Sequence, residues 1–408
     1  MIDFTFPPEV EAVRDRVREF IDNVVRPADE AARAKGTPDR ETWKRVIVDL
    51  RRQAKERSLW LPHMPPEWGG MGLTNTELAA FSTEAGRTSI GPFVMNCQAP
   101  DEGNQHTLLK FGTPEQQEKY LKPLCEGRIR SCFAMTEPEV AGSDPSLTQT
   151  RAVLDGDEWV VNGHKWFISN ALGAKFAILM ARTEDNPEVP QAANSAFIVD
   201  IPSDGWEVVR SVDTMAGKHN HCEIRITDLR LPKDALLGER GGGQKLSQAR
   251  LGAGRLGHCM RWIGQTEQAL DMMVDRALNR YSHGSLLSDK QGIQWLISES
   301  GIALYQCKLM VLHASYKLDS GQPYQHEISM AKYFVATTLW NVIDRAIQVH
   351  GALGYSTDTP LGEMLKQARW ARFADGADEV HKWKVAKNLI KAYQEHGTTA
   401  SATGGLPL

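Results

Sequence analysis

The stretch Cys132-Phe133-Ala134-Met135-Thr136-Glu137-Pro138-Glu139-Val140-Ala141-Gly142-Ser143-Asp144 marks the point where the chain changes from a helical to an extended pattern. It begins with apolar residues typical of a strand, breaks at Pro138 and continues through small and hydroxyl residues. Such a loop can bring backbone N–H groups and short hydroxyls close to a flat polar ligand or a phosphate. An ordinary strand-to-loop junction has the same composition, so the rest of the chain must decide between the two interpretations.

Composition excludes several classes of protein. The 408 residues are enough for roughly two or three domains, and a formal net charge of -4 without long basic runs makes a nucleic-acid partner improbable. The N-terminus has no signal-peptide pattern, and no apolar run approaches the ~18 residues of a membrane span. The six cysteines lack C-x-x-C spacing, which predicts buried thiols in a cytoplasmic protein and no zinc site; they are Cys97, Cys125, Cys132, Cys222, Cys259 and Cys307.

The residues before this stretch have a helical period. Apolar residues recur at three- and four-residue steps near the N-terminus, which predicts one buried helix face; they are Val10, Val13, Val17, Ile21 and Val24. Thr113-Pro114-Glu115-Gln116 has the pattern of a capping box with proline at the first helical position. Residues 62–72, rich in proline and glycine, are expected to form a loop between helices.

Residues 131–235 alternate as strands do. Asp155-Gly156 and Asn162-Gly163 are dipeptides typical of hairpin turns, and they flank a short apolar run around Trp159. Phe176–Ala181 and Ala196–Ile201 have the composition of buried strands. In residues 222–227 apolar and polar residues alternate, which predicts a strand with one face in water.

From Gln244 to Tyr393 the period is helical again. We interpret Gly241-Gly242-Gly243 as a flexible connector, because it matches neither G-x-G-x-x-G nor a P-loop. Two apolar seams predict long helices in an antiparallel bundle: Ile293, Ile297, Ser300, Leu304, Cys307, Val311 and Ala314 form one, and Met330, Phe334, Val342, Ala346 and Val349 the other.

The predicted fold is α+β and mostly helical, because helical, β and helical segments follow one another. We expect an N-terminal helical domain at 1–130, a middle β-domain at 131–235, a C-terminal helical bundle at 236–395 and a loose tail at 396–408. This order fits neither a Rossmann fold nor a TIM barrel.

The chain resembles the acyl-CoA dehydrogenase family over about residues 5–395, and the family's three domains match the predicted order. The motifs that carry the resemblance are Pro66-Glu67-Trp68-Gly69-Gly70-Met71-Gly72, Phe133–Asp144, Asn162-Gly163-His164-Lys165-Trp166-Phe167-Ile168-Ser169-Asn170, Arg280–Gln291 and Gln348-Val349-His350-Gly351-Ala352-Leu353-Gly354-Tyr355. The subgroup of members 10 and 11 is the most similar, by Ala99–Asn104, Gly254-Arg255-Leu256, His258-Cys259-Met260-Arg261 and Ala374–His381.

The resemblance implies an FAD site. It places Phe133, Met135 and Thr136 along the flavin ring, Gly142 and Ser143 near the pyrophosphate or the acyl-CoA, and Phe167 where relatives carry tryptophan. Ser169 takes the place of a threonine whose hydroxyl reaches flavin N5. The remaining residues that match FAD contacts are Arg280, Ser282, Gln348, Gly351, Ala377 and Glu379, of which the first two reach the cofactor of a neighbouring subunit. A homodimer or homotetramer is therefore implied.

The reaction implied is α,β-dehydrogenation of an acyl-CoA thioester to a trans-2-enoyl-CoA, with electrons passed to an electron-transferring flavoprotein. Where many relatives carry glutamate, this chain has Asp375, followed by Gly376 at a substrate-contacting position. Aspartate is one methylene shorter, and its pKa must rise well above about 3.9, which desolvation by bound substrate can provide. The nearby acids Asp378 and Glu379 are the competing candidates for the base.

Two alternatives stay open on the same scaffold. Nitroalkane oxidases of this superfamily use aspartate as the base, which keeps a flavin oxidase or monooxygenase in view. A flavin-binding scaffold without catalysis is the other. The pair His219 and His221 has no third ligand nearby, so a surface or hydrogen-bonding role is favoured over metal binding, and polar contacts are expected for His350 and His381.

Overall fold

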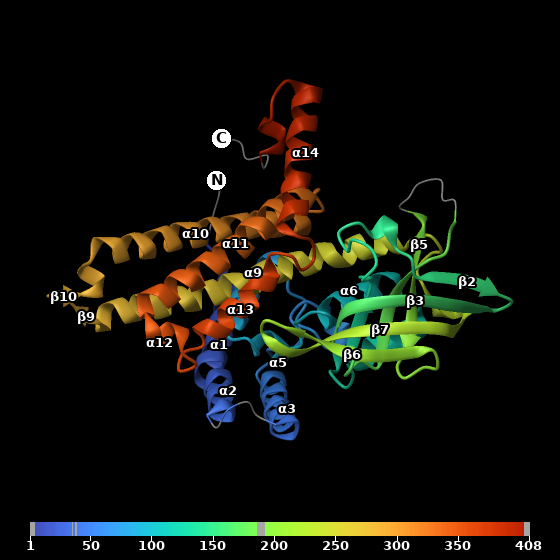
Figure 1. The fold of residues 1–408 in the computed structure, drawn as a ribbon, viewed down its shortest axis with the longest axis horizontal. Coiled ribbons are helices and arrows are strands. Elements are labelled where there is room, and N and C mark those ends of the chain that lie inside the picture. The colour runs from blue at the N-terminus through green and yellow to red at the C-terminus, as the bar shows by residue number, and fades with distance from the viewer. Residues whose placement is uncertain (1–4, 35, 37–38, 186–191, 404–408) are drawn as a thin grey trace. The chain divides into compact units, whose positions relative to one another are not determined.

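The computed structural model describes residues 5–34, 36, 39–185 and 192–403, without the side chains of residues 40, 218 and 219 (Figure 1). The chain forms two compact units. The first comprises residues up to His63, Met71–Cys97 and Arg255 onward, and the second comprises Met64–Gly70 and Gln98–Gly254. The finer division into three domains, and the looseness of the tail, stay predictions.

Helices occupy both ends of the chain, as predicted. Those before the sheet are α1 (Pro8–Phe20), α2 (Arg26–Arg33), α3 (Arg40–Glu56), α4 (Asn75–Ala85), α5 (Gly91–Val94), α6 (Asp101–Phe111), α7 (Pro114–Gln116) and α8 (Lys122–Cys125). Those after it are α9 (Gly243–Asn279), α10 (Gln291–Asp319), α11 (Gln325–His350), α12 (Ala352–Tyr355), α13 (Leu361–Ala371) and α14 (Asp378–His396).

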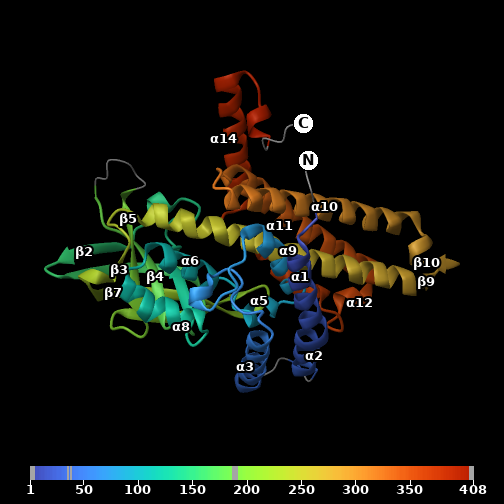
Figure 2. The ribbon, with the colours of Figure 1, turned by 180° about the vertical axis from the view of Figure 1, so that it is seen from behind.

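The first helices follow the predicted pattern. Val10, Val17 and Ile21 are buried on one face, and a π-helical turn at Ile21–Val25 brings Val25 into the same core. Helix α2 lies beside α3 (Figure 2). The capping box at the start of α7 is confirmed, because the Thr113 hydroxyl accepts from Gln116 N while Gln116 Oε1 accepts from Thr113 N.

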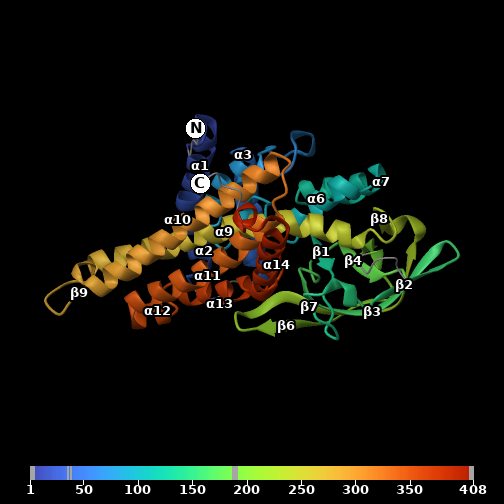
Figure 3. The ribbon, with the colours of Figure 1, turned by 90° about the horizontal axis from the view of Figure 1, so that it is seen from above.

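The middle of the chain forms an eight-stranded sheet in the second unit, and Figure 3 shows β6, β7, β3 and β2 along it. Its order is β6-β7-β3-β2-β4-β5-β8, with β1 added to β4 in parallel. The strands are β1 (Ser131–Ala134), β2 (Arg151–Asp155), β3 (Glu158–Ser169), β4 (Phe176–Arg182), β5 (Asn194–Asp200), β6 (Trp206–Thr214), β7 (Gly217–Pro232) and β8 (Leu236–Leu237). A separate hairpin joins β9 (Tyr281–Ser282) to β10 (Ser285–Leu286).

One of the two predicted turns is wrong. Asp155-Gly156 does join β2 to β3, but Asn162-Gly163 lies inside β3, at a register shift against β7. Asn162 holds this bulge together, since its side chain donates to Asp228 Oδ1 and accepts from Asp228 N. Gly163 is needed for close approach, because a Cβ there would lie 2.3 Å from Thr150 Oγ1.

The buried strands follow the prediction. Residues of β4 from Phe176 to Ala181 are fully buried, and in β7 Cys222, Ile224 and Ile226 face the core while Arg225 and Thr227 are exposed. All six cysteines lie in the described part of the chain and are buried thiols, as predicted. Gly243 was expected to be part of a flexible connector. The structure gives another explanation for glycine at this position, because a Cβ there would lie 2.7 Å from Asn194 O.

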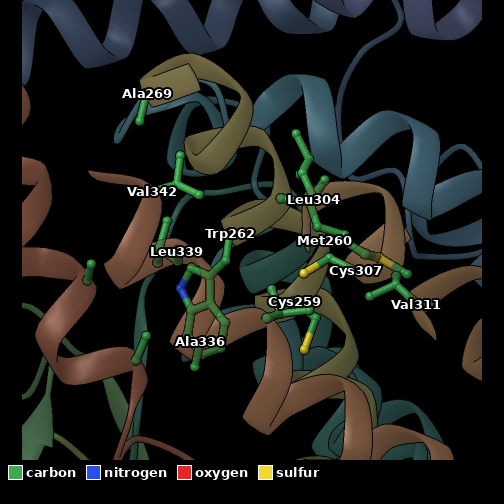
Figure 4. Packing of buried hydrophobic residues seen from close by; sticks show 14 of the residues in the cluster. Cys259, Met260, Trp262, Ala269, Leu304, Cys307, Val311, Ala336, Leu339 and Val342 are labelled. Atoms are coloured by element: carbon green, nitrogen blue, oxygen red, sulfur yellow. The ribbon is translucent and has the colours of Figure 1, made fainter. Parts of the chain in front are cut away.

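The C-terminal helices enclose one apolar core in the first unit. The seam predicted on α10 holds in part, since Ile293 and Ile297 are half-buried and the other five residues are buried: Ser300, Leu304, Cys307, Val311 and Ala314. Figure 4 shows this core where α9, α10 and α11 meet. The seam predicted on α11 holds in part, since Val342, Ala346 and Val349 are buried and Met330 and Phe334 are half-buried.

Helices α4 and α9 cross at close range through glycine. A Cβ on Gly264 would lie 1.9 Å from Thr83 O, whereas Gly301 on α10 has nothing within 4 Å. We therefore expect Gly264→Ala to force the two helices apart and lower the free energy of unfolding by about 1–3 kcal/mol or more. The matched control Gly301→Ala should raise it by about 0.5–1 kcal/mol. Urea titration followed by circular dichroism measures both, and equal effects of the two changes would contradict the close crossing.

Candidate active site

The loop after β1, which carries Met135 and Thr136, is held by a fully buried ion pair. Lys165 Nζ donates to Met135 O at 2.9 Å and to Glu137 Oε1 at 2.8 Å. Burial lowers the pKa of Lys165 to about 8. Burial alone would raise the pKa of Glu137, but the charge of Lys165 and the hydrogen bonds to this carboxylate hold it below its usual value. The pair therefore holds the loop after β1 in place through Met135 O and the Glu137 side chain.

Next to this loop, Phe167 occupies a strained position on β3. It has a φ of +52° and lies in the register shift between Lys165 and Ile168, with its side chain 44% exposed. A bulky residue rarely adopts the left-handed region, and such strain concentrates at ligand sites. Two residues on, Ser169 Oγ lies 2.8 Å from His221 Nδ1, so the predicted hydrogen-bonding role holds for His221, while the His219 side chain lies outside the described residues.

The other predicted residues of the second unit lie on this loop or on β1 just before it. Gly142 and Ser143 are exposed, and a Cβ on Gly142 would lie 2.9 Å from Thr136 Cγ2, so glycine lets the loop fold close to Thr136. Phe133 lies under the Arg250 guanidinium at 4.0 Å. The exposed Phe167 side chain, next to a loop of small residues, fits a flat aromatic ligand such as a flavin ring.

In the first unit, Asp375 lies in the turn between α13 and α14. Its φ is +52° and that of Gly376 is +110°, so the turn is strained at a residue with a side chain. Two cations hold the backbone of the turn. Arg255 Nε donates to Asp375 O at 2.7 Å. Lys332 Nζ donates to Ala371 O at 2.8 Å and to Gly376 O at 2.6 Å. Burial lowers the pKa of Lys332 to about 8.

The Asp375 carboxylate is the best placed of the three candidate acids. Its side chain is 25% exposed, and Oδ2 lies 3.3 Å from His258 Nε2. Asp378 is instead buried and accepts from Arg372 Nε at 2.7 Å, which is a structural role at the start of α14. Glu379 is exposed and Ala377 is the N-cap residue of α14. Burial lowers the pKa of the neighbouring His381 to about 3, so its imidazole is neutral.

The structure does not bring the remaining predicted FAD residues to Asp375 within one chain. Arg280 and Ser282 follow the far end of α9, where Asn279 lies 24 residues, or roughly 36 Å, from Arg255. Gln348 and Gly351 end α11, where Gln348 lies 16 residues, or roughly 24 Å, from Lys332. Figure 3 shows α11 running from near α14 toward α12.

The described residues lack two features. None of their helices combines the length and apolar character needed to cross a membrane. Nor do they contain a group of three His, Cys, Asp or Glu side chains suited to holding a metal ion. His350, for which a polar contact was predicted, is buried with Nδ1 2.8 Å from Ala346 O.

Several residues at these sites were not predicted from the sequence. Arg255 and His258 were noted only as subgroup markers, and Lys332 and Lys165 received no role. One signal was present: Arg255, His258 and Arg261 recur at three-residue steps, which places three polar side chains on one face of the helix.

Comparisons with known proteins place the chain. Models of the N-terminal, middle and C-terminal domains of acyl-CoA dehydrogenases match residues 7–128, 132–229 and 241–390. Probable acyl-CoA dehydrogenase FadE2 of Mycobacterium tuberculosis is 38% identical over 98% of this chain and 100% of its own length. Mouse acyl-CoA dehydrogenase family member 10 is 38% identical over 94% of this chain, which spans only 37% of that protein's length. A solved structure, a putative acyl-CoA dehydrogenase from Mycobacterium abscessus, is 37% identical with a TM-score of 0.90 over 96% of this chain and all of its own. The chain therefore belongs to the acyl-CoA dehydrogenase family.

Proposed function

We propose that the chain is an FAD-dependent acyl-CoA dehydrogenase that converts an acyl-CoA thioester to a trans-2-enoyl-CoA, with Asp375 as the base. One observation supports the proposal most directly. The turn that bears Asp375 is strained and its backbone is fixed by Arg255 and Lys332, whereas the Asp375 side chain is 25% exposed. An acid with a purely structural role would be expected to resemble Asp378, which is buried and accepts a hydrogen bond from Arg372.

The residues divide into two roles. Phe133, Met135, Thr136, Phe167 and Ser169 would hold the FAD ring, and the cofactor, when bound, accepts the β-hydrogen as hydride. Asp375 would remove the α-proton of the thioester and carry it on its carboxylate. Gly376 lets the turn pass close to its neighbours, since a Cβ there would lie 2.8 Å from His381 Nε2.

Two partners follow from this proposal. Electrons would leave for an electron-transferring flavoprotein, and a second copy of the chain would complete the cofactor site at Arg280 and Ser282. Large apolar side chains exposed on α10 and α14 support an oligomer, since a monomer rarely exposes so many; they are Trp295, Ile302, Tyr305, Trp383, Ile390 and Tyr393. Light scattering on the purified protein should show a dimer or tetramer, and a monomer at micromolar concentration would contradict this part.

The first experiment is anaerobic reduction. The protein should purify yellow and lose its visible absorbance on mixing with a member of an acyl-CoA panel that varies in chain length, branching and hydroxylation. Bleaching only by nitroalkanes, with rapid oxygen consumption, would replace the proposal with an oxidase. A colourless protein that takes up no FAD would point to a scaffold.

A further inference from the structure

We propose that His258 is a positioning residue for Asp375: a neutral imidazole whose Nε2–H is directed at the carboxylate. The inference rests on the proposed role of Asp375 as the base and deepens it. His258 Nε2 lies 3.3 Å from Asp375 Oδ2, at the long end of hydrogen-bonding distance. Catalytic hydrogen bonds are often long without substrate and tighten in the complex.

The neighbour on the other side of the ring determines where the proton is. Arg261 NH2 lies 3.3 Å from His258 Nδ1, and a guanidinium can only donate hydrogen bonds. Nδ1 must therefore accept, which places the single proton of the ring on Nε2. Arg261 is itself fixed, because its NH1 donates to Cys97 O at 2.9 Å. Arg261 thus donates both to Cys97 O and to His258 Nδ1, and His258 donates from Nε2 to Asp375.

Aromatic neighbours leave the imidazole little freedom to turn. Trp262 stacks on it with ring centroids 5.2 Å apart and planes at 16°, and Trp370 meets it edge-on at 5.4 Å. His258 is only 8% exposed. A ring held in this way can keep one oxygen of the Asp375 carboxylate in a fixed position.

This arrangement gives the shorter aspartate a defined geometry. Arg255 fixes the backbone carbonyl of Asp375 and His258 fixes Oδ2, so both ends of the residue are held. An error of about 1 Å in the position of a catalytic group can lower the rate by on the order of a hundredfold. Restricting the motion of the Asp375 carboxylate therefore matters as much for the rate as its average position.

Two variants separate positioning from mere packing. His258→Leu removes the donor at similar volume, and we expect flavin reduction by acyl-CoA to slow between about 10-fold and 100-fold. Because a donor stabilises the charged carboxylate, its loss should also move the acidic limb of the pH–rate profile to higher pH. His258→Gln keeps an N–H at a similar reach and should restore most of the rate and the position of the limb. Arg255, Lys332 and His381 also interact with Asp375, and they are unchanged in both variants.

A measurement without turnover completes the test. In protein labelled with ¹⁵N-histidine, the signals lost in His258→Gln identify His258, and they should show the neutral Nε2–H tautomer at pH 7. The opposite tautomer, or an unshifted pH limb in a folded His258→Leu protein, would overturn the inference. These outcomes differ from failure of the proposed function itself, which would appear as normal reduction in Asp375→Asn.

Discussion

Asp375→Asn should leave a folded, yellow protein that acyl-CoA no longer bleaches at a useful rate. The change keeps the size and the hydrogen-bonding reach of the side chain but removes the charge that accepts the α-proton. General-base catalysis is worth about 10²- to 10⁴-fold, so flavin reduction in a stopped-flow experiment should slow by that factor. The visible spectrum and FAD content should stay as in the wild type, because the Arg255 and Lys332 hydrogen bonds go to backbone carbonyls.

The matched control is Glu379→Gln, which removes the exposed acid four positions further along the chain. It should keep the rate of bleaching within a few-fold of the wild type, although FAD affinity can change if Glu379 contacts the cofactor. The reverse result, with Glu379→Gln inactive and Asp375→Asn active, would move the base to α14. Asp378→Asn is a poorer control, because it breaks the buried pair with Arg372 and destabilises the turn.

Periodicity predicted the helices well, because burial of one face dictates where apolar residues must recur. The α10 seam and the first face of α1 were read from spacing alone. The dipeptide Asn162-Gly163 misled the same reasoning. A turn and a bulge both select asparagine and glycine, and what distinguishes them is Thr150 pressing on Gly163 from a neighbouring segment. Sequence alone does not show that neighbour.

Contacts at the candidate site were predictable only where a motif carried them. Asp375 could be singled out by its resemblance to a family position. The groups that hold it come from α9 and α11, more than forty positions earlier in the chain, and nothing in their local pattern says which turn they face. The Ser169–His221 contact is harder still, because the register between β3 and β7 shifts twice before reaching it.

The buried Lys165–Glu137 pair should be the costliest polar contact to break in the second unit. Lys165→Met leaves the Glu137 carboxylate buried without its cation, and such a loss destabilises a protein by about 3–5 kcal/mol. The double variant Lys165→Met with Glu137→Gln removes both charges and should recover a large part of that loss. Urea unfolding at pH 7 measures both, and single and double variants of equal stability would show that the pair contributes little.

The pair should also make stability depend on acid. The pKa of Glu137 is lower in the folded chain than its ordinary value of 4.5, so the unfolded chain takes up the proton first. The stability that the ionised Glu137 carboxylate contributes is therefore complete above about pH 4.5. It is lost as the pH falls through the pKa of Glu137 in the folded chain. The wild type should lose more stability than the double variant between pH 6 and pH 3. Glu137 follows Met135 and Thr136 in the loop and also accepts from Gln149 N and Thr150 N, so release of FAD should accompany that loss before the sheet unfolds.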